Sequence, residues 1–501
     1  TLFPYTTLFR SITKRYNIYN LRLVLENDDG DIIIDKGFNY KSSRIYNNDI
    51  YNEFTIKFKL DKPYIYFYHF EFNDCYGMHF IGRNDELDAI LTDDVPVNYQ
   101  INVSDKEISN FPWYQGKIMY QILVDRFNRS SDFDIKKINM NYKYNYILHK
   151  DFNEEIIDFP YNGDYHVDFF GGSLKGIEEK LDYLKSLNVS VIYLNPIFLS
   201  PTSHKYNTSD YLMIDPMYGT INDFRSLIEK AKEKDIYIIL DGVFNHTGDD
   251  SIYFNKYNHF DSIGAYQSKS SIFHKWYDFK NFEKDPNDYK SWWGIKTLPS
   301  VNQNSNFVSF ITEKDGVINT WMQEGIKGFR LDVVDEINDK FVSKINKAIK
   351  SVDKDSIVIG EVWEDATNKC AYSKRRQYFN GHELDSVMNY PIKDGIIDYL
   401  KNNNLRSLVI KIRNEINNYH FNNLNLLMNI LGTHDTPRII TTLSNVNFQN
   451  PNINKLTYRL DKESLDLATC KLKMAYMILY TLPGIPCIYY GDEVAIEGFQ
   501  D

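Results

Sequence analysis

Eight apolar segments, spread from residue 117 to residue 493, constrain the fold more than any other feature of the sequence. None of them alternates apolar with polar residues, and helical patterns such as 176–187 and 221–234 lie between them. Alternating strands and helices predict a parallel sheet, and eight such units are the number that closes a (β/α)8 TIM barrel of the α/β class. The segments are KIMYQILV (117–124), VSVIYLNP (189–196), DIYIILDGVFNH (235–246), IKGFRLDVV (326–334), SIVIGEVW (356–363), LDSVMNYP (384–391), LNLLMNILGTHD (424–435) and GIPCIYYGDE (484–493).

The first hundred residues have a different rhythm. Short segments at 21–26, 54–60 and 64–72 alternate apolar and polar residues, and clusters of turn-forming residues separate them. This period of two, with many β-branched and aromatic residues, predicts antiparallel strands. We therefore predict an all-β sandwich domain over residues 12–110, followed by the barrel domain over residues 111–501.

The two ends of the chain look unnatural. Residues 1–11, TLFPYTTLFRS, lack an initiator Met and resemble the translation of a sequencing-adapter oligonucleotide, so we exclude them from the predicted fold as an artefact. A genuine first strand is the alternative. The chain stops at Asp501 soon after the eighth apolar segment, which predicts a barrel that is incomplete at its end. Such a start carries no readable targeting signal, and a cytoplasmic protein is the expectation.

Composition excludes several classes of partner. The formal net charge is −11, from 57 basic and 68 acidic residues, so no basic stripe is available for nucleic acid. No apolar run approaches the roughly 18 residues that a membrane-spanning helix needs. Four cysteines have spacings that match neither a metal-binding pair nor a disulfide scaffold, and we expect buried free thiols at Cys75, Cys370, Cys470 and Cys487.

One connection is much longer than the others. It runs from about residue 247 to residue 318, between the third and fourth apolar segments, and it contains Trp276, Trp292 and Trp293. Long loops in compact domains are usually functional. We predict an inserted loop domain over the face of the barrel where active sites lie.

Polar residues gather just past the apolar part of four predicted strands. In a parallel barrel these positions meet at the carboxyl-terminal rim. Any one of them could be a structural cap or part of an ion pair, but carboxylates at four rim positions together predict an active site. The residues are Asp241, Asn245, His246, Arg330, Asp332, Glu361, His434 and Asp435.

Two of these carboxyl groups have surroundings that suggest different roles. Arg330 and Asp332 are two residues apart and point to the same side of the sheet, so the guanidinium is expected to lower the pKa of Asp332 and favour a charged nucleophile. Glu361 follows the apolar run SIVIG, with Trp363 two places on, which suits a general acid that holds its proton. A carboxyl separation of about 5 to 5.5 Å, as in retaining glycosidases, is the prediction.

The motifs at these positions resemble the four signature regions of glycoside hydrolase family 13, the α-amylase family. They are DGVFNH (241–246), GFRLDVVDE (328–336), GEVWE (360–364) and LGTHDTPR (431–438). With a β-sandwich in front, the pattern is most similar to the neopullulanase, cyclomaltodextrinase and maltogenic amylase group, over about residues 13–501. The resemblance implies a retaining hydrolase of α-1,4 bonds in maltodextrins, cyclodextrins or pullulan, with an α-glucan as its partner.

The resemblance also implies a role for each residue. Asp332 would be the nucleophile, Glu361 the acid/base and Asp435 the third carboxylate, which holds sugar hydroxyls. Glu336 stands where many α-amylases have a Lys-His pair, which favours the neopullulanase-like group. The sandwich is similar to the family's starch-binding or dimerisation module, so a homodimer through it is one option. The implied sugar-binding residues are Tyr206, which stacks on the sugar, Asp241, which supports Arg330, and His246, Arg330 and His434 themselves.

Calcium is the one cofactor that the resemblance suggests, and no organic cofactor is implied. The segment DRFNRSSDFD (125–134) is similar to a calcium loop of this group, in which Asn128, Asp132 and Asp134 would supply oxygen ligands. Relatives use an acidic residue where this chain has Ser173, and losing that charge weakens such a site. Asn245 is a candidate ligand for a second calcium, or else it makes a simple strand-end hydrogen bond.

Two other functions stay open at this point. A sugar hydroxyl could take the place of water, which would make the enzyme a transglycosylase. A non-catalytic carbohydrate-binding or transporter-associated relative would keep the fold, but such proteins typically lose catalytic carboxylates, and all three are present here.

Overall fold

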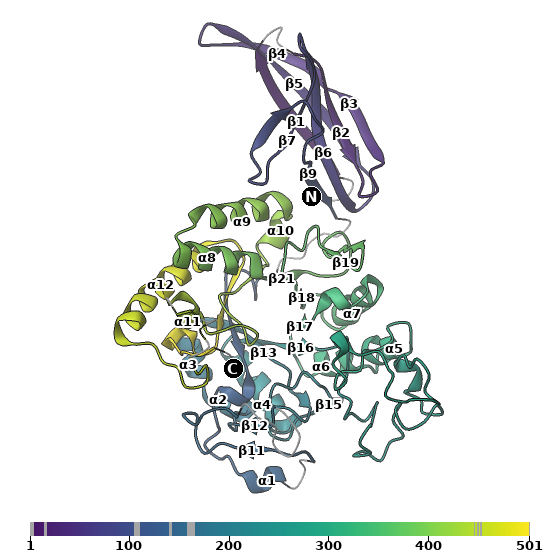
Figure 1. Cartoon of the computed structure of the whole chain (residues 1–501), viewed down its shortest axis with the longest axis vertical. Helices are drawn as coiled ribbons and strands as arrows, with labels where there is room; N and C mark the ends of the chain where they lie inside the picture. Colours follow the sequence, from purple (N-terminus) through teal and green to yellow (C-terminus); the bar gives the residue numbers. More distant parts are fainter. Residues whose placement is uncertain are drawn as a thin grey trace. The chain divides into compact units, whose positions relative to one another are not determined.

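The chain divides into two compact units (Figure 1). The computed structural model describes residues 5–14, 18–104, 111–139, 143–157, 166–444, 446–447, 450 and 453–499. The N-terminal unit comprises Thr1–Ser109, Asp365–Glu383 and Leu405–Leu424. The barrel unit comprises Asn110–Glu364, Leu384–Asn404 and Asn425–Asp501.

The barrel unit contains a closed barrel of eight parallel strands, which confirms the predicted (β/α)8 fold. Each predicted apolar segment contains one strand, and the strands follow one another around the barrel in chain order. Their side chains are almost all buried, which explains why the segments show no polar alternation. The strands are β10 (Ile118–Ile122), β13 (Val189–Leu194), β16 (Tyr237–Gly242), β17 (Gly328–Leu331), β18 (Ile357–Gly360), β21 (Ser386–Asn389), β22 (Met428–Asn429) and β23 (Ile485–Tyr489).

Helices connect these strands, and the longer ones bury one face. In α4, Phe224, Leu227 and Ala231 are buried at helical spacing, and the helix begins with a capping box between Thr220 and Asp223. The helices are α1 (Ile135–Asn139), α2 (Leu174–Glu179), α3 (Leu181–Ser186), α4 (Ile221–Glu233), α5 (Phe307–Thr312), α6 (Val317–Gln323), α7 (Asp339–Val352), α8 (Tyr390–Asn402), α9 (Leu405–Asn418), α10 (Phe421–Leu424), α11 (Ile439–Leu443) and α12 (Lys462–Thr481).

Short two-stranded ladders lie outside the barrel. They are β11 (Ile147–Leu148) with β12 (Asp168–Phe169), β14 (Phe198–Leu199) with β15 (Asp210–Ile214), and β19 (Cys370–Ala371) with β20 (Lys374–Arg375). The hairpin of β14 and β15 matters for the site, because the loop between its strands carries Tyr206.

The N-terminal unit is built on two antiparallel sheets, as predicted for a sandwich. One sheet has the order β1-β5-β4 and the other the order β3-β2-β6-β7-β8, with β9 paired to β6. Its core draws on β5 and on strands of the other sheet, through Leu23, Leu25, Ile56, Phe58, Leu60, Tyr66 and Val103. The strands are β1 (Tyr5–Lys14), β2 (Tyr19–Glu26), β3 (Ile32–Gly37), β4 (Asn39–Tyr46), β5 (Asp49–Leu60), β6 (Tyr64–Asp74), β7 (Gly77–Arg83), β8 (Ala89–Thr92) and β9 (Tyr99–Val103).

Two boundaries differ from the prediction. Residues 1–11 were excluded from the fold, yet β1 pairs with β5 along its whole length, and the Phe9 ring packs on Phe58 at 5.6 Å. Two segments after residue 364, predicted as part of the barrel domain, belong to the N-terminal unit. Gln100 of β9 donates to Thr367 in the first of them at 2.8 Å, which a reading along the chain could not foresee.

The long connection after β16 has more regular structure than a loop domain, because α5 and the start of α6 lie within the predicted range 247–318. Trp276 is buried, whereas Trp293 is 80% exposed.

The cysteine prediction was wrong in part. All four are free, but only Cys487 is buried, because the other three lie on a turn, a short hairpin and an outer helix face. None of the helices in the described residues combines the length and apolar character needed to cross a bilayer.

Candidate active site

Neighbouring barrel strands bring the predicted catalytic residues to one rim. Asp241 in β16 pairs in register with Arg330 in β17, and Asp332 follows β17 directly. Glu361 occupies the corresponding place directly after β18, the next strand. His434 and Asp435 follow β22, so the carboxyl ends of four strands supply the set.

A single buried guanidinium holds three of the carboxylates. Arg330 is fully buried, and its Nη1 lies 2.8 Å from Asp332 Oδ1 and 2.8 and 2.9 Å from the two oxygens of Asp241. Its Nη2 lies 2.8 Å from Glu361 Oε2. One positive charge therefore faces three acidic side chains, and this local excess of negative charge favours retention of a proton.

Strained backbone lies next to the predicted nucleophile. Val333 has φ +39° and ψ +50°, a left-handed conformation that is a genuine outlier for a β-branched residue. This conformation aims the Val333 N–H at Glu361 Oε2, with a hydrogen bond of 2.8 Å. Strain of this kind persists at functional sites, where the surrounding structure enforces it.

The pKa order of the two carboxyl groups is the reverse of the sequence prediction. Burial raises the pKa of Asp332 well above its usual range despite Arg330, and the charges of Glu361, Asp241 and Asp435 raise it further. Burial also acts to raise the pKa of Glu361, but Arg330, the Val333 N–H and the Trp363 indole outweigh it and lower that pKa. The reversal arises because the second guanidinium nitrogen reaches Glu361 on the next strand.

The predicted stacking residue lies beside the predicted third carboxylate. The Tyr206 ring stacks on His434 with centroids 5.0 Å apart and an interplanar angle of 7°. His434 Nε2 lies 3.4 Å from Asp435 Oδ2, and the Asp435 side chain is 41% exposed. Asp435 thus offers an accessible carboxylate to hydroxyl groups, while the Tyr206 ring stacks on the rings of His434 and His204.

His246 also belongs to this group. Its Nε2 lies 3.1 Å from the carbonyl oxygen of Tyr206, and its ring stacks on Trp292 of the long connection at 5.5 Å. Burial lowers the pKa of His246 to about 4, so the ring is neutral near neutral pH. Trp293, next in the chain, donates its indole N–H to Glu336 at 3.3 Å.

Sequence reasoning missed three polar side chains of the site. Tyr193 donates to Asp241 Oδ2 at 2.6 Å, and Gln121 and Asn195 bond to each other and approach His434. A usable signal was present, because Gln121 is the one amide within the apolar run MYQIL and Asn195 directly follows the apolar strand β13.

The predicted calcium ligands are not gathered into an acidic cage. Asn128 donates its amide to Gly176 O at 3.0 Å, and the Ser173 hydroxyl accepts from Gly176 N as the N-cap of α2. Asp132 and Asp134 are both exposed. In the part of the chain that the structure describes, no three His, Cys, Asp or Glu side chains are grouped to hold a metal. Calcium binding by Asn128, Asp132 and Asp134 stays a prediction.

Asn245, the candidate for a second calcium, is buried, and its backbone carbonyl accepts from Val301 N at 3.0 Å. Its side-chain Nδ2 is buried without a hydrogen-bond partner among the described residues, so its role as a calcium ligand stays a prediction.

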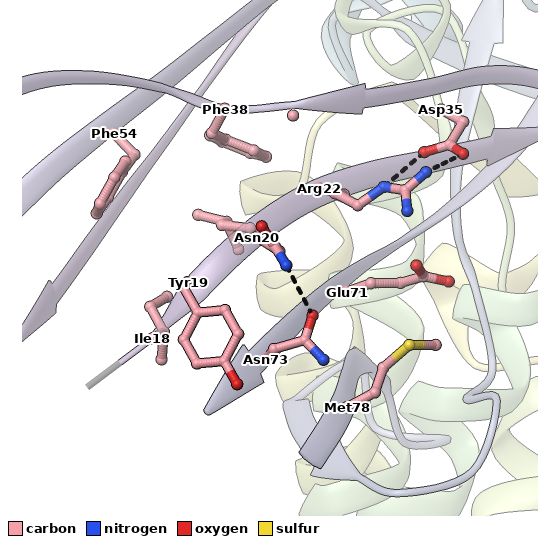
Figure 2. Close-up of a pocket in the computed structure, with 12 residues that line it drawn as sticks. Ile18, Tyr19, Asn20, Arg22, Asp35, Phe38, Phe54, Glu71, Asn73 and Met78 are labelled. Atoms are coloured by element: carbon pink, nitrogen blue, oxygen red, sulfur yellow. Dashed lines mark hydrogen bonds and ion pairs between the residues drawn. The ribbon is translucent and has the colours of Figure 1, made fainter. Parts of the chain in front are cut away.

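A separate cavity of about 600 Å³ lies in the N-terminal unit, lined by residues of β2, β3, β5, β6 and β7 (Figure 2). Figure 2 shows Arg22 paired with Asp35 and Asn20 bonded to Asn73 across it. None of the predicted site residues lines this cavity. The predicted chemistry thus belongs to the barrel unit alone.

Comparison with known proteins identifies the barrel. Residues 121–501 match the family model for the α-amylase catalytic domain. The chain belongs to the α-amylase family. This confirms the resemblance drawn from the four motifs, and the barrel is that of a glycoside hydrolase.

Individual relatives refine the comparison. An amylopullulanase of Thermoanaerobacterium saccharolyticum is 36% identical over 499 residues, which cover 90% of this chain and 37% of that protein. Neopullulanase 2 of Thermoactinomyces vulgaris is 30% identical over 343 residues, which cover 67% of this chain and 52% of that protein. This α-amylase-family chain thus spans little more than a third of the amylopullulanase.

A solved structure supports the fold. The type III pullulan hydrolase of Thermococcus kodakarensis aligns with a TM-score of 0.63 and 24% identity, over 99% of this chain and 79% of that one.

Proposed function

We propose that this chain is a retaining α-glucan hydrolase that cleaves α-1,4-glucosidic bonds of maltodextrins, cyclodextrins or pullulan. The observation that carries the proposal is the bridging of Asp332 and Glu361 by the single guanidinium of Arg330. This bridge holds two carboxyl groups at neighbouring strand ends. The amylopullulanase and neopullulanase relatives support the choice of substrate class.

In the first step, Glu361 gives its proton to the glycosidic oxygen as the bond from that oxygen to C1 breaks. An oxygen of Asp332 forms a new bond to C1, so the departing sugar leaves with the proton and a covalent glycosyl-enzyme remains. In the second step, Glu361 takes a proton from water, the water oxygen attacks C1 and Asp332 departs. Two inversions at C1 leave the product in the α configuration.

The proposed roles require a proton to change place when substrate binds. In the ligand-free protein the pKa of Asp332 is raised and that of Glu361 is lowered. In the proposed cycle, a bound sugar draws Glu361 away from Arg330, which removes the largest influence that lowers its pKa. Asp332 keeps its own contact with Arg330 and becomes the charged member, as a nucleophile must be.

Product analysis tests the proposal. The protein is incubated with pullulan and with γ-cyclodextrin, and the anomeric proton signals of the first products are followed by NMR. We expect reducing sugar from at least one substrate, with the α anomer formed first. Initial formation of the β anomer would contradict retention, and absence of reducing sugar from all α-glucans would contradict the function.

A matched pair of variants localises the activity. Glu361→Gln removes the proton donor and is expected to lower kcat by at least about 10³-fold, within the range for general acid catalysis combined with electrostatic effects. Glu324→Gln is the control, because Glu324 pairs with the exposed Arg225 before β17, at the opposite end of the strand from Asp332. We expect the control to keep full activity.

Transglycosylation uses the same covalent intermediate and differs only in the acceptor, so chromatography of products at high sugar concentration separates the two outcomes. A homodimer through the N-terminal unit and a cytoplasmic location stay predictions from the sequence, and neither enters the mechanism.

A further inference from the structure

Five side chains form a continuous hydrogen-bonded network from Asp241 to His434. Tyr206 OH lies 2.8 Å from Asp241 Oδ2, and Asn195 Nδ2 lies 2.9 Å from Tyr206 OH. Gln121 Nε2 lies 3.0 Å from Asn195 Oδ1. The network ends on His434 Nδ1, which is 3.1 Å from Asn195 Nδ2 and 3.3 Å from Gln121 Nε2.

The direction of each bond in this network follows from the first one. Both oxygens of Asp241 already accept from Arg330, and Oδ2 also accepts from Tyr193. Tyr206 must therefore donate to Asp241. A hydroxyl has only one proton, so the Tyr206 oxygen accepts from its other neighbour, and Asn195 must present its NH2 group there.

The orientation of Asn195 then dictates that of Gln121. The Asn195 NH2 group faces Tyr206 and His434, so its carbonyl oxygen faces Gln121. Gln121 must therefore donate from its own NH2 group to that oxygen. The Gln121 carbonyl oxygen is left buried with no partner among the described residues. A buried carbonyl oxygen without a hydrogen bond costs free energy. An amide that only filled space would avoid that cost, so the arrangement favours an NH2 group directed at Asn195 and His434.

Two NH2 groups thus point at Nδ1 of one imidazole. A protonated Nδ1 would meet two donors, so Nδ1 must accept, and a ring with a single proton carries it on Nε2. Nε2 is the nitrogen that faces Asp435, at 3.4 Å. The ring is further held by its stacking on Tyr206.

We propose that Gln121 and Asn195 are positioning residues that lock His434 in the Nε2–H tautomer, so that it presents one fixed donor to a sugar hydroxyl beside Asp435. The kinetic part of this inference rests on the proposed hydrolase function, whereas the tautomer itself does not. The charged and titratable groups around His434 are Asp435, Tyr206, Glu361 and His204.

The tautomer can be measured directly on the ligand-free protein. Histidines are labelled with ¹⁵N, and the ring nitrogen shifts are recorded at pH 7 by long-range ¹H–¹⁵N correlation. The sequence has 11 His, and the signals that vanish in His434→Gln identify the ring of interest. We expect a proton on Nε2 and none on Nδ1. A proton on Nδ1 would overturn the inference whether or not the protein hydrolyses any glucan.

Two substitutions of Asn195 test the positioning role by the order of their effects. Asn195→Asp keeps the shape but replaces the donor with an acceptor, so we expect Nδ1 to gain a proton and kcat/KM to fall at least about tenfold, as for a misdirected donor in an active site. Asn195→Ala leaves the Gln121 donor in place, so we expect a smaller fall. A purely structural role predicts the opposite order, since the isosteric Asp fits better than Ala.

A matched control sits at the other end of the same strand. Asn188 precedes β13 and is exposed, with a left-handed φ of +59° that Asp tolerates. Asn188→Asp adds the same charge and is expected to change neither the His434 shifts nor kcat/KM. If Asn195→Asp proves less harmful than Asn195→Ala, or leaves Nδ1 unprotonated, the inference is wrong. If Asn195→Asp does not fold, Gln121→Glu provides the same change from donor to acceptor.

Discussion

Two fully buried cations among the described residues of the barrel unit differ in the number of carboxylates with which they form ion pairs. Arg330 pairs with Asp241, Asp332 and Glu361. Lys205 pairs with Asp215, with Nζ 2.6 Å from Oδ2, and it also donates to Ser200 O at 3.2 Å.

Lys205 and Asp215 form an ordinary structural ion pair, in which one positive charge faces one negative charge. Lys205 also lies near the rings of Phe169 and Tyr218, 4.6 and 5.1 Å away, which stabilise a cation without adding a charge. Asp215 accepts from the backbone N–H groups of Ser200 and Met217. The charges at this site cancel, whereas those around Arg330 do not. A buried excess of one sign is costly for stability, and its presence at a strand-end rim marks chemistry rather than packing.

Asp332→Asn should have the largest effect on activity of all the substitutions considered. It removes one of the mutually repelling carboxylates while keeping the shape, so we expect kcat/KM to fall by at least about 10⁴-fold, with a melting temperature unchanged or raised. Activity assays and thermal melts of the same preparation check both parts. A large loss of stability would show that Asp332 is a structural partner of Arg330, and retained activity would remove it as the nucleophile.

Lys205→Met should behave in the opposite way. It leaves the Asp215 carboxylate buried without its cation, which costs about 3 to 5 kcal/mol of unfolding free energy. The fall in melting temperature should be much larger than in Asp332→Asn. The double variant Lys205→Met and Asp215→Asn removes both charges and keeps an acceptor for the backbone, so it should recover most of the loss. No recovery would mean that the ammonium acts through more than its pairing with Asp215.

A third cluster, around Glu178, has the opposite imbalance of charge to that around Arg330, because here one anion faces two cations. Glu178 Oε1 pairs with Lys175 and with Lys230, both at 2.5 Å, and Ser226 donates to Oε2. Burial alone would raise the pKa of Glu178, but Lys175, Lys230 and Ser226 lower it to about 2.

This shift predicts a window of acid sensitivity. A carboxyl whose folded-state pKa is lowered contributes stability that is present above its unfolded pKa, near 4.5, and is lost as the pH falls toward 2. The contribution is at most about 3 kcal/mol. Denaturant melts between pH 2 and pH 6 should therefore show a shallower pH dependence in Glu178→Gln than in the parent. Parallel curves for the two proteins would contradict the role of this cluster.

The eight strands and the rim positions of the candidate site residues could be predicted because both depend on local sequence. Apolar runs mark strands that are buried on both faces, and the residue that follows each run must lie at the rim. The pKa order of Asp332 and Glu361 could not be predicted, since it depends on which strand each guanidinium nitrogen of Arg330 reaches. The hydrogen bonds of Gln121 and Asn195 to His434 could not be predicted either, because they join residues from three different strands. The pairing of β1 was missed for another reason, namely that residues 1–11 were judged by their origin rather than by their pattern.

Calcium should produce the smallest effect on stability. This experiment tests whether a calcium loop that lacks one acidic ligand can be restored by adding that ligand. The loop offers two exposed carboxylates, Asp132 and Asp134, and Ser173 stands where the resemblance to the family implies a further acid. A site this weak, with Kd on the order of 10⁻⁴ M or higher, stabilises the protein by at most about 1.4 kcal/mol in 1 mM calcium. We therefore expect EDTA to shift the melting temperature by less than about 4 °C.

Ser173→Asp should enlarge that shift. Asp caps a helix as well as Ser does, so the α2 cap is kept while a carboxylate is added to the loop. Ser173→Asn, which caps equally well but adds no charge, is the control and should respond to calcium as the parent does. A strong stabilisation of the parent by calcium would show that Asn128, Asp132 and Asp134 already form the site that the sequence suggested. Equal responses of the Asp and Asn variants would instead mean that calcium does not bind near position 173 at all.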